Sequence, residues 1–112
     1  MPRTAVILED DVGLRYALSG LLASFDYTVF PVATAQDAMA CFNHDDIGVF
    51  LADVLIGGEP SGLDIAGAVR VRWPSTRIFL MSSDHLLASQ AEPLEFLPKP
   101  VDLSALQRIA ET

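Results

Sequence analysis

Short apolar runs alternate with helix-like segments along the whole chain, and this alternation limits its fold more than any other feature. Residues 5–8 and 47–52 are apolar runs that stop at acidic residues, and the run at residues 77–81 stops at serines. Runs of this kind are typical of strands buried on both faces of a sheet. Shorter runs at residues 28–30 and 95–97 predict two more strands.

Helix-period segments separate these strands. Leu14, Leu18 and Leu22 recur at the spacing of one helix face. Thr34 is a predicted N-cap, with Asp37 three residues later in a loose capping box. The predicted helices cover residues 14–22, 35–42, 63–72, a short segment at 86–91 and the stretch after Asp102.

Strands that alternate with helices favour βαβ units and a parallel sheet covered on both faces. With five strands and right-handed crossovers, the expected architecture is α/β, a flavodoxin-like doubly wound (βα)5 fold. The 112 residues have room for a single domain, residues 1–112, which can also be a piece of a longer protein.

Charge and cysteine content exclude several classes of function. The net charge of −8 opposes direct binding of nucleic acid or anionic lipid by this domain. The single cysteine, Cys41, cannot form an internal disulfide, which indicates a reducing compartment. No apolar run approaches the roughly 20 residues of a membrane span, and the N-terminal run is too short for a signal peptide. We therefore expect a cytoplasmic domain with no membrane contact.

Polar residues gather where the predicted strands end. Glu9 and Asp10 follow the first strand, Asp53 the third, Ser82 the fourth and Lys99 the fifth. In doubly wound sheets the ligand site lies at these carboxyl ends. Two carboxylates about 5 Å apart repel by about 3 kcal/mol at an effective dielectric near 20. An all-oxygen cluster of this kind suits Mg²⁺, and an aspartate in it can act as a nucleophile that forms an aspartyl phosphate.

The order of these motifs resembles the receiver domain of two-component response regulators, of the chemotaxis-regulator type. The matching runs are residues 6–11 (VILEDD), 51–53 (LAD), 80–83 (LMSS) and 96–100 (FLPKP). The resemblance implies that Asp53 is the phosphoacceptor. It implies a Mg²⁺ site, in which Mn²⁺ can replace Mg²⁺, formed by Asp10, Asp53, Glu9 through water, and the backbone carbonyl of Leu55. Ser82, the backbone N–H of Ser83 and Lys99 would bind the phosphoryl group, and Ser82 and Phe96 would form the conformational switch.

The resemblance also implies the partners. A histidine kinase or phosphotransfer protein would donate the phosphoryl group, and an output partner of unknown identity would read the change on the face of helix four, strand five and helix five. The domain would catalyse its own phosphorylation and dephosphorylation without acting as an enzyme on other substrates. The Lys99–Pro100 bond is cis in this family.

Two departures from the family pattern lie in the segments between its motifs. Gly57 stands where the family commonly has proline. Ser82 and Lys99 are only 17 positions apart in the sequence. The second departure predicts a shortened helix four, similar to receivers attached to hybrid histidine kinases.

The sequence is also compatible with three other functions. A Mg²⁺-dependent phosphatase with an aspartyl nucleophile would want an acid two residues after Asp53, where Leu55 stands. A flavin-binding module would need a phosphate cradle where Glu9 and Asp10 lie. An unphosphorylated protein-interaction module is disfavoured because all the key chemical positions are filled.

Overall fold

Five parallel strands form one sheet in the order β2-β1-β3-β4-β5. The computed structural model describes residues 3–54, 61–84 and 94–111. The strands are β1 (Thr4–Leu8), β2 (Thr28–Val32), β3 (Val49–Asp53), β4 (Arg77–Ser82) and β5 (Glu95–Pro98). This strand order confirms the predicted doubly wound, flavodoxin-like sheet, in which β1 and β3 lie at the point where the order reverses.

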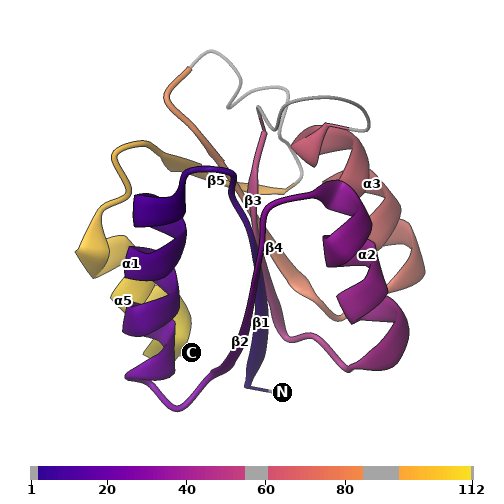
Figure 1. Cartoon of the computed structure of the whole chain (residues 1–112), viewed down its shortest axis with the longest axis horizontal. Coiled ribbons are helices and arrows are strands. Elements are labelled where there is room, and N and C mark those ends of the chain that lie inside the picture. Colours follow the sequence, from indigo (N-terminus) through magenta and orange to yellow (C-terminus); the bar gives the residue numbers. More distant parts are fainter. Residues whose placement is uncertain (1–2, 55–60, 85–93, 112) are drawn as a thin grey trace.

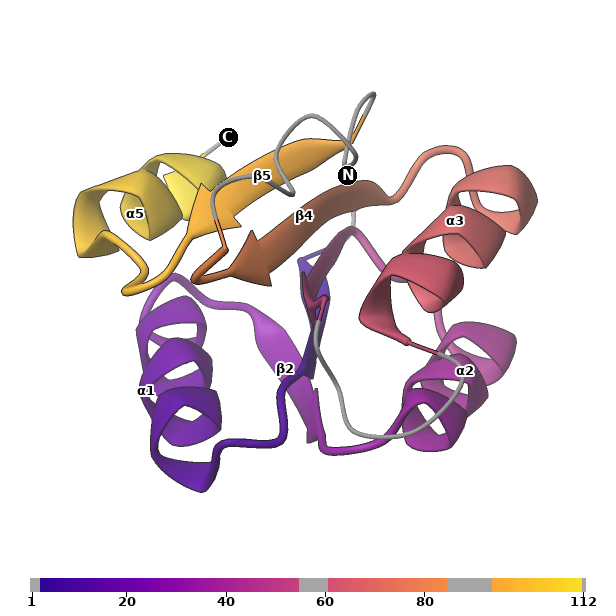
Figure 2. The same cartoon turned by 90° about the horizontal axis from the view of Figure 1, so that it is seen from above.

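Helices cover both faces of the sheet (Figures 1 and 2). One face carries α1 (Val12–Ala23) and α5 (Leu103–Glu111), and the other carries α2 (Ala35–His44) and α3 (Gly62–Arg72). None of the described helices is long and apolar enough to cross a membrane. The predicted short helix at residues 86–91 lies outside the described residues, and so does the loop with Leu55 and Gly57.

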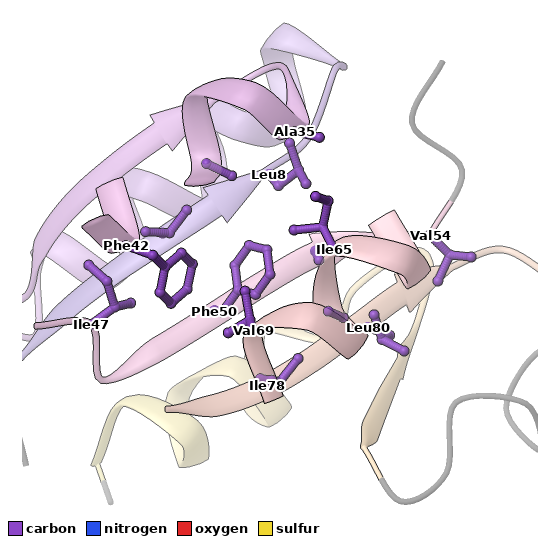
Figure 3. Packing of buried hydrophobic residues seen from close by; sticks show 14 residues of the cluster. Leu8, Ala35, Phe42, Ile47, Phe50, Val54, Ile65, Val69, Ile78 and Leu80 are labelled. Carbon is purple, nitrogen blue, oxygen red and sulfur yellow. The ribbon is translucent and has the colours of Figure 1, made fainter. Parts of the chain in front are cut away.

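The core has two halves, one on each face of the sheet. Alternate residues of β3 point to opposite faces, so Phe50 packs beneath α2 and α3 while Leu51 packs beneath α1 and α5. Figure 3 shows the first half, where Phe42 of α2 meets the ring of Phe50 edge to face at a centroid distance of 5.1 Å. Since all of β3 and all of β1 except Thr4 are buried, the carboxyl ends of these strands are held in fixed positions next to each other.

Several strand boundaries differ from the prediction. The strand β2 continues through Pro31 to Val32, because β2 is an edge strand and an edge tolerates the missing N–H of proline. The strand β3 begins at Val49 instead of residue 47, because the carbonyl of Ile47 accepts a hydrogen bond from the Thr76 hydroxyl at 2.7 Å. The strand β4 includes Ser82, which places that residue within the sheet ladder.

Side-chain caps fix where the helices begin. The Thr34 hydroxyl accepts a hydrogen bond from the Asp37 N–H at 3.2 Å, as the sequence predicted. Asp102 accepts a hydrogen bond from the Ser104 N–H at 2.9 Å before α5. Ser61 and Asp64 form a full capping box at the start of α3, which the sequence analysis missed.

Candidate functional site

Three carboxylates meet at the carboxyl ends of β1 and β3. Glu9 and Asp10 follow β1, Asp53 ends β3, and one oxygen of each lies within 4.8 Å of the others. Glu9 and Asp53 are buried, whereas Asp10 is exposed. The site is therefore closed toward the sheet and open toward solvent on the side of Asp10.

Glu9 is a fully buried carboxylate with partners on both oxygens. Its Oε1 accepts a hydrogen bond from Lys99 Nζ at 2.6 Å, and its Oε2 accepts one from the Asp11 N–H at 3.1 Å. Burial raises the pKa of Glu9 above its usual value, against the opposing effects of Lys99 and the Asp11 N–H. The cost of burying this carboxylate is thus only partly offset by its partners.

Lys99 binds two of the three carboxylates. Its Nζ lies 3.1 Å from Asp53 Oδ2 as well as 2.6 Å from Glu9 Oε1. Burial acts to lower the pKa of Lys99, but the hydrogen bonds to Glu9 and Asp53 outweigh burial, and the pKa is raised. The Lys99 N–H donates to the Ser82 carbonyl at 2.9 Å, and the Lys99–Pro100 bond is cis, as the resemblance implied. Lys99 is therefore charged and directed inward at neutral pH.

The charges of this cluster fit a divalent cation. With Glu9, Asp10 and Asp53 ionised and Lys99 protonated, the cluster carries a charge of −2. Carboxylate oxygens are the ligands that Mg²⁺ prefers, and Mg²⁺ commonly keeps several waters. The exposed side of Asp10 leaves access for a hydrated ion, so the donor set and the charge both fit Mg²⁺.

Ser82 lies beside this cluster at the end of β4. It is buried, and its hydroxyl accepts a hydrogen bond from the Asp84 N–H at 3.0 Å. Its strand neighbour Met81 is paired with Asp53, so the serine comes one residue after that pair. Ser83 follows and is exposed. The structure thus places a hydroxyl and a main-chain N–H at the edge that bears Asp53.

Phe96 is half-buried in β5, where it is paired with Leu80 of β4. Its ring packs against the half of the core beneath α2 and α3, whereas the next residue, Leu97, packs on the opposite half. Phe96 thus lies two residues along β5 from Pro98, the residue paired with Ser82.

Comparison with known proteins decides the family. The sequence model of the response regulator receiver domain matches residues 5–111. The chain belongs to this family. Within it, the DNA-binding transcriptional regulator NtrC of Azospirillum brasilense is 27% identical over 113 residues, which is 96% of this chain and 23% of that protein. The response regulator protein FleR of Pseudomonas aeruginosa is 26% identical over 111 residues, which is 95% of this chain and 23% of FleR.

Solved structures show the same fold. NtrX from Brucella abortus superimposes with a TM-score of 0.84 at 20% identity, over 99% of this chain and 26% of NtrX. The chemotaxis response regulator CheY4 of Vibrio cholerae superimposes with a TM-score of 0.81 at 19% identity, over 99% of this chain and 98% of CheY4. The receiver domain therefore spans about a quarter of its curated relatives, whereas it matches CheY4 along nearly all of its length.

Two side-chain contacts hold the loop after β1 in this receiver domain, and sequence reasoning missed the first of them. The Arg15 guanidinium donates to the Glu9 carbonyl at 2.7 Å, and Asp11 caps α1 by accepting from the Leu14 N–H at 2.9 Å. The sequence signal for the first contact was an arginine one turn into the helix that follows the acidic pair. Together the two contacts fix the loop that carries Glu9 and Asp10. The predicted ligand Leu55 lies outside the described residues.

Proposed function

We propose that this receiver domain accepts a phosphoryl group on Asp53 from the phosphohistidine of a histidine kinase or a phosphotransfer protein. The observation that carries the proposal is the position of Lys99, which contacts both Asp53 and Glu9 at the edge of the three-carboxylate cluster. A partly buried cation next to a buried aspartate and two further acids is an arrangement that suits phosphoryl transfer to a carboxylate.

In the proposed reaction an oxygen of Asp53 attacks the phosphorus atom in line. The new O–P bond forms as the N–P bond of the phosphohistidine breaks, and the electron pair of that bond stays on the imidazole nitrogen. Lys99 then exchanges its contact with the Asp53 carboxylate for one with a phosphoryl oxygen. The Ser82 hydroxyl and the Ser83 N–H would donate to the other phosphoryl oxygens.

Asp10, Asp53 and, through water, Glu9 would hold Mg²⁺ or Mn²⁺, together with the Leu55 carbonyl. When bound, the metal ion would neutralise negative charge on the transferring phosphoryl group. The proposal is supported by the charge of −2 on the cluster with Lys99 and by the exposure of Asp10.

The proposed output is a conformational switch at Ser82 and Phe96. In the structure the Ser82 hydroxyl is held by the Asp84 N–H at 3.0 Å. If Ser82 turned toward a phosphoryl group, it would give up this bond, and the space it leaves would admit the half-buried Phe96 ring. The surface of β5 and α5 would then change, and an output partner would read this surface.

We further propose that residues 1–112 work as one domain in the cytoplasm, without direct binding of nucleic acid. The free thiol of Cys41 and the net charge of −8 support these two points. The proposal does not extend to the activities of the longer relatives, of which this chain covers about a quarter.

Intact-mass spectrometry with acetyl phosphate tests the proposal. In the presence of Mg²⁺, wild type should gain one phosphoryl group that is stable in acid and labile in base, and Asp53→Ala should gain none. A lack of added mass on wild type, or equal labelling of Asp53→Ala, would contradict the assignment of Asp53 as the phosphoacceptor. Steady turnover of p-nitrophenyl phosphate would instead favour the phosphatase alternative.

A further inference from the structure

The first residue of α3, Gly62, lies against the main chain of Asp53. A Cβ atom at position 62 would lie 1.7 Å from the Asp53 carbonyl oxygen and 2.7 Å from the Asp53 carbonyl carbon. Both atoms belong to the backbone, so no side-chain rotation can relieve the clash. By contrast, Cβ atoms at Gly20 of α1 and Gly67 of α3 would meet nothing within 4 Å. Only Gly62 among these three needs to be glycine for close approach.

The other side of Asp53 is held by the sheet. Asp53 is paired with Met81 of β4, and the next N–H, that of Val54, donates to the Met81 carbonyl at 3.0 Å. The backbone of Asp53 is therefore confined between β4 and the first turn of α3. Added volume at position 62 must therefore push either α3 or the end of β3 out of place.

The first turn of α3 has little freedom to move away. In its capping box the Ser61 N–H donates to the Asp64 carboxylate and the Asp64 N–H donates to the Ser61 hydroxyl, each at 3.2 Å. The next turns of the helix are buried in the core through Ile65, Ala66 and Val69. A side chain at position 62 would thus displace the Asp53 end of the contact more readily than the helix.

We propose that Gly62 is a positioning residue for Asp53. Its missing side chain lets α3 rest on the Asp53 carbonyl, and this contact sets where the Asp53 carboxylate lies relative to Glu9, Asp10 and Lys99. The inference rests on the proposed function, because it gives Gly62 a role in metal binding and phosphoryl transfer. To bring the Cβ contact of 1.7 Å out to 3.0 Å, the backbone must move by more than an ångström. A displacement of that size separates Asp53 Oδ2 from Lys99 Nζ, now 3.1 Å apart.

The test compares two glycines of the same helix. Gly67→Ala is the control, and Gly62→Ala/Gly67→Ala is the test variant, since alanine at position 67 improves helix propensity and supports folding of both proteins. We expect the test variant to bind Mn²⁺ about ten-fold more weakly than the control in electron paramagnetic resonance titrations. At saturating Mn²⁺ and acetyl phosphate, its labelling rate should be about a hundred-fold lower. Metal affinity and labelling rate within two-fold of the control in the folded test variant would overturn the inference.

A measurement on the wild type covers the case in which Gly62→Ala fails to fold. Because Gly62 contacts the Asp53 carbonyl, titration with Mg²⁺ should shift the Gly62 amide resonance in NMR spectra and leave that of Gly67 unchanged. An unmoved Gly62 resonance at saturating Mg²⁺ would refute the inference. Neither metal titration needs phosphoryl transfer, so a wild type that binds metal but takes no label would contradict the proposed function alone.

Discussion

Lys99 Nζ lies 2.6 Å from Glu9 Oε1. This contact links the end of β5 to the end of β1, across β3 and β4, which lie between them in the sheet. The two residues are 90 positions apart in the chain. Glu9 is fully buried, so without Lys99 its charge would face, among the described residues, the Asp11 N–H and two other acids. Lys99 therefore also stabilises the folded protein, by compensating the charge of the buried Glu9 carboxylate.

Loss of Lys99 should destabilise the metal-free protein. We expect Lys99→Met to lower the free energy of unfolding by about 3 kcal/mol, because it leaves the buried Glu9 carboxylate without its cation. Arg70→Met removes the same charge from an exposed helix position and should change stability by at most about 0.5 kcal/mol. Urea unfolding measures both, and equal stabilities of the two variants would show that the Lys99–Glu9 contact contributes nothing.

The contribution of Lys99 should disappear at high pH. Its pKa in the folded protein is raised above the usual 10.5, so the folded state holds the proton more tightly than the unfolded state. The stabilisation is fully present below pH 10.5 and is lost as pH rises through the folded pKa. The difference in unfolding free energy between wild type and Lys99→Met should therefore be constant from about pH 7 to 10 and shrink above this range. A difference that grows with pH would contradict the raised pKa.

Mg²⁺ should stabilise the wild type through Asp10. A ligand that binds only the folded state at ten times its dissociation constant adds about 1.4 kcal/mol to the unfolding free energy. We expect this gain in wild type and little of it in Asp10→Asn. Asp46→Asn carries the same charge change at the opposite end of the sheet, just before β3, and should respond to Mg²⁺ like wild type. If Asp10→Asn gains as much as Asp46→Asn, the cluster is not the metal site.

Phosphorylation should move the ring of Phe96 and leave that of Phe42 in place. Phe96 is half-buried at the edge strand β5, whereas Phe42 packs between Phe50 and Trp73 in the core. With fluorinated phenylalanine in the chain, acetyl phosphate and Mg²⁺ should shift the ¹⁹F resonance of Phe96 but not that of Phe42. Spectra in which both signals stay fixed while the protein is fully labelled would remove Phe96 from the switch.

The sheet and the gathering of the acids could be predicted from the sequence for one physical reason. Strands buried on both faces read as apolar runs, and parallel strands bring their carboxyl ends to one edge. The runs before Glu9 and Asp53 thus sufficed to place these two residues together. Pro31 obscured the end of β2, since a proline argues against a strand until the strand is known to lie at an edge.

The contacts within the site depended on packing that no residue pattern contains. Which carboxylate Lys99 would reach follows from the burial of Glu9 and from the path of the chain after β5. Likewise, the pattern of α3 predicted a helix at residues 63–72, but the approach of Gly62 to the Asp53 carbonyl depends on how closely that helix is seated on the sheet.

The identity of the phosphoacceptor tests the account most directly. Wild type is labelled with acetyl phosphate and Mg²⁺, reduced with borohydride and digested, and the peptides are sequenced by tandem mass spectrometry. Borohydride converts an acyl phosphate to an alcohol, so position 53 should read as homoserine in the labelled sample and as aspartate in the unlabelled control. Homoserine at position 10, or phosphate on a serine with Asp53 unchanged, would contradict the assignment of Asp53.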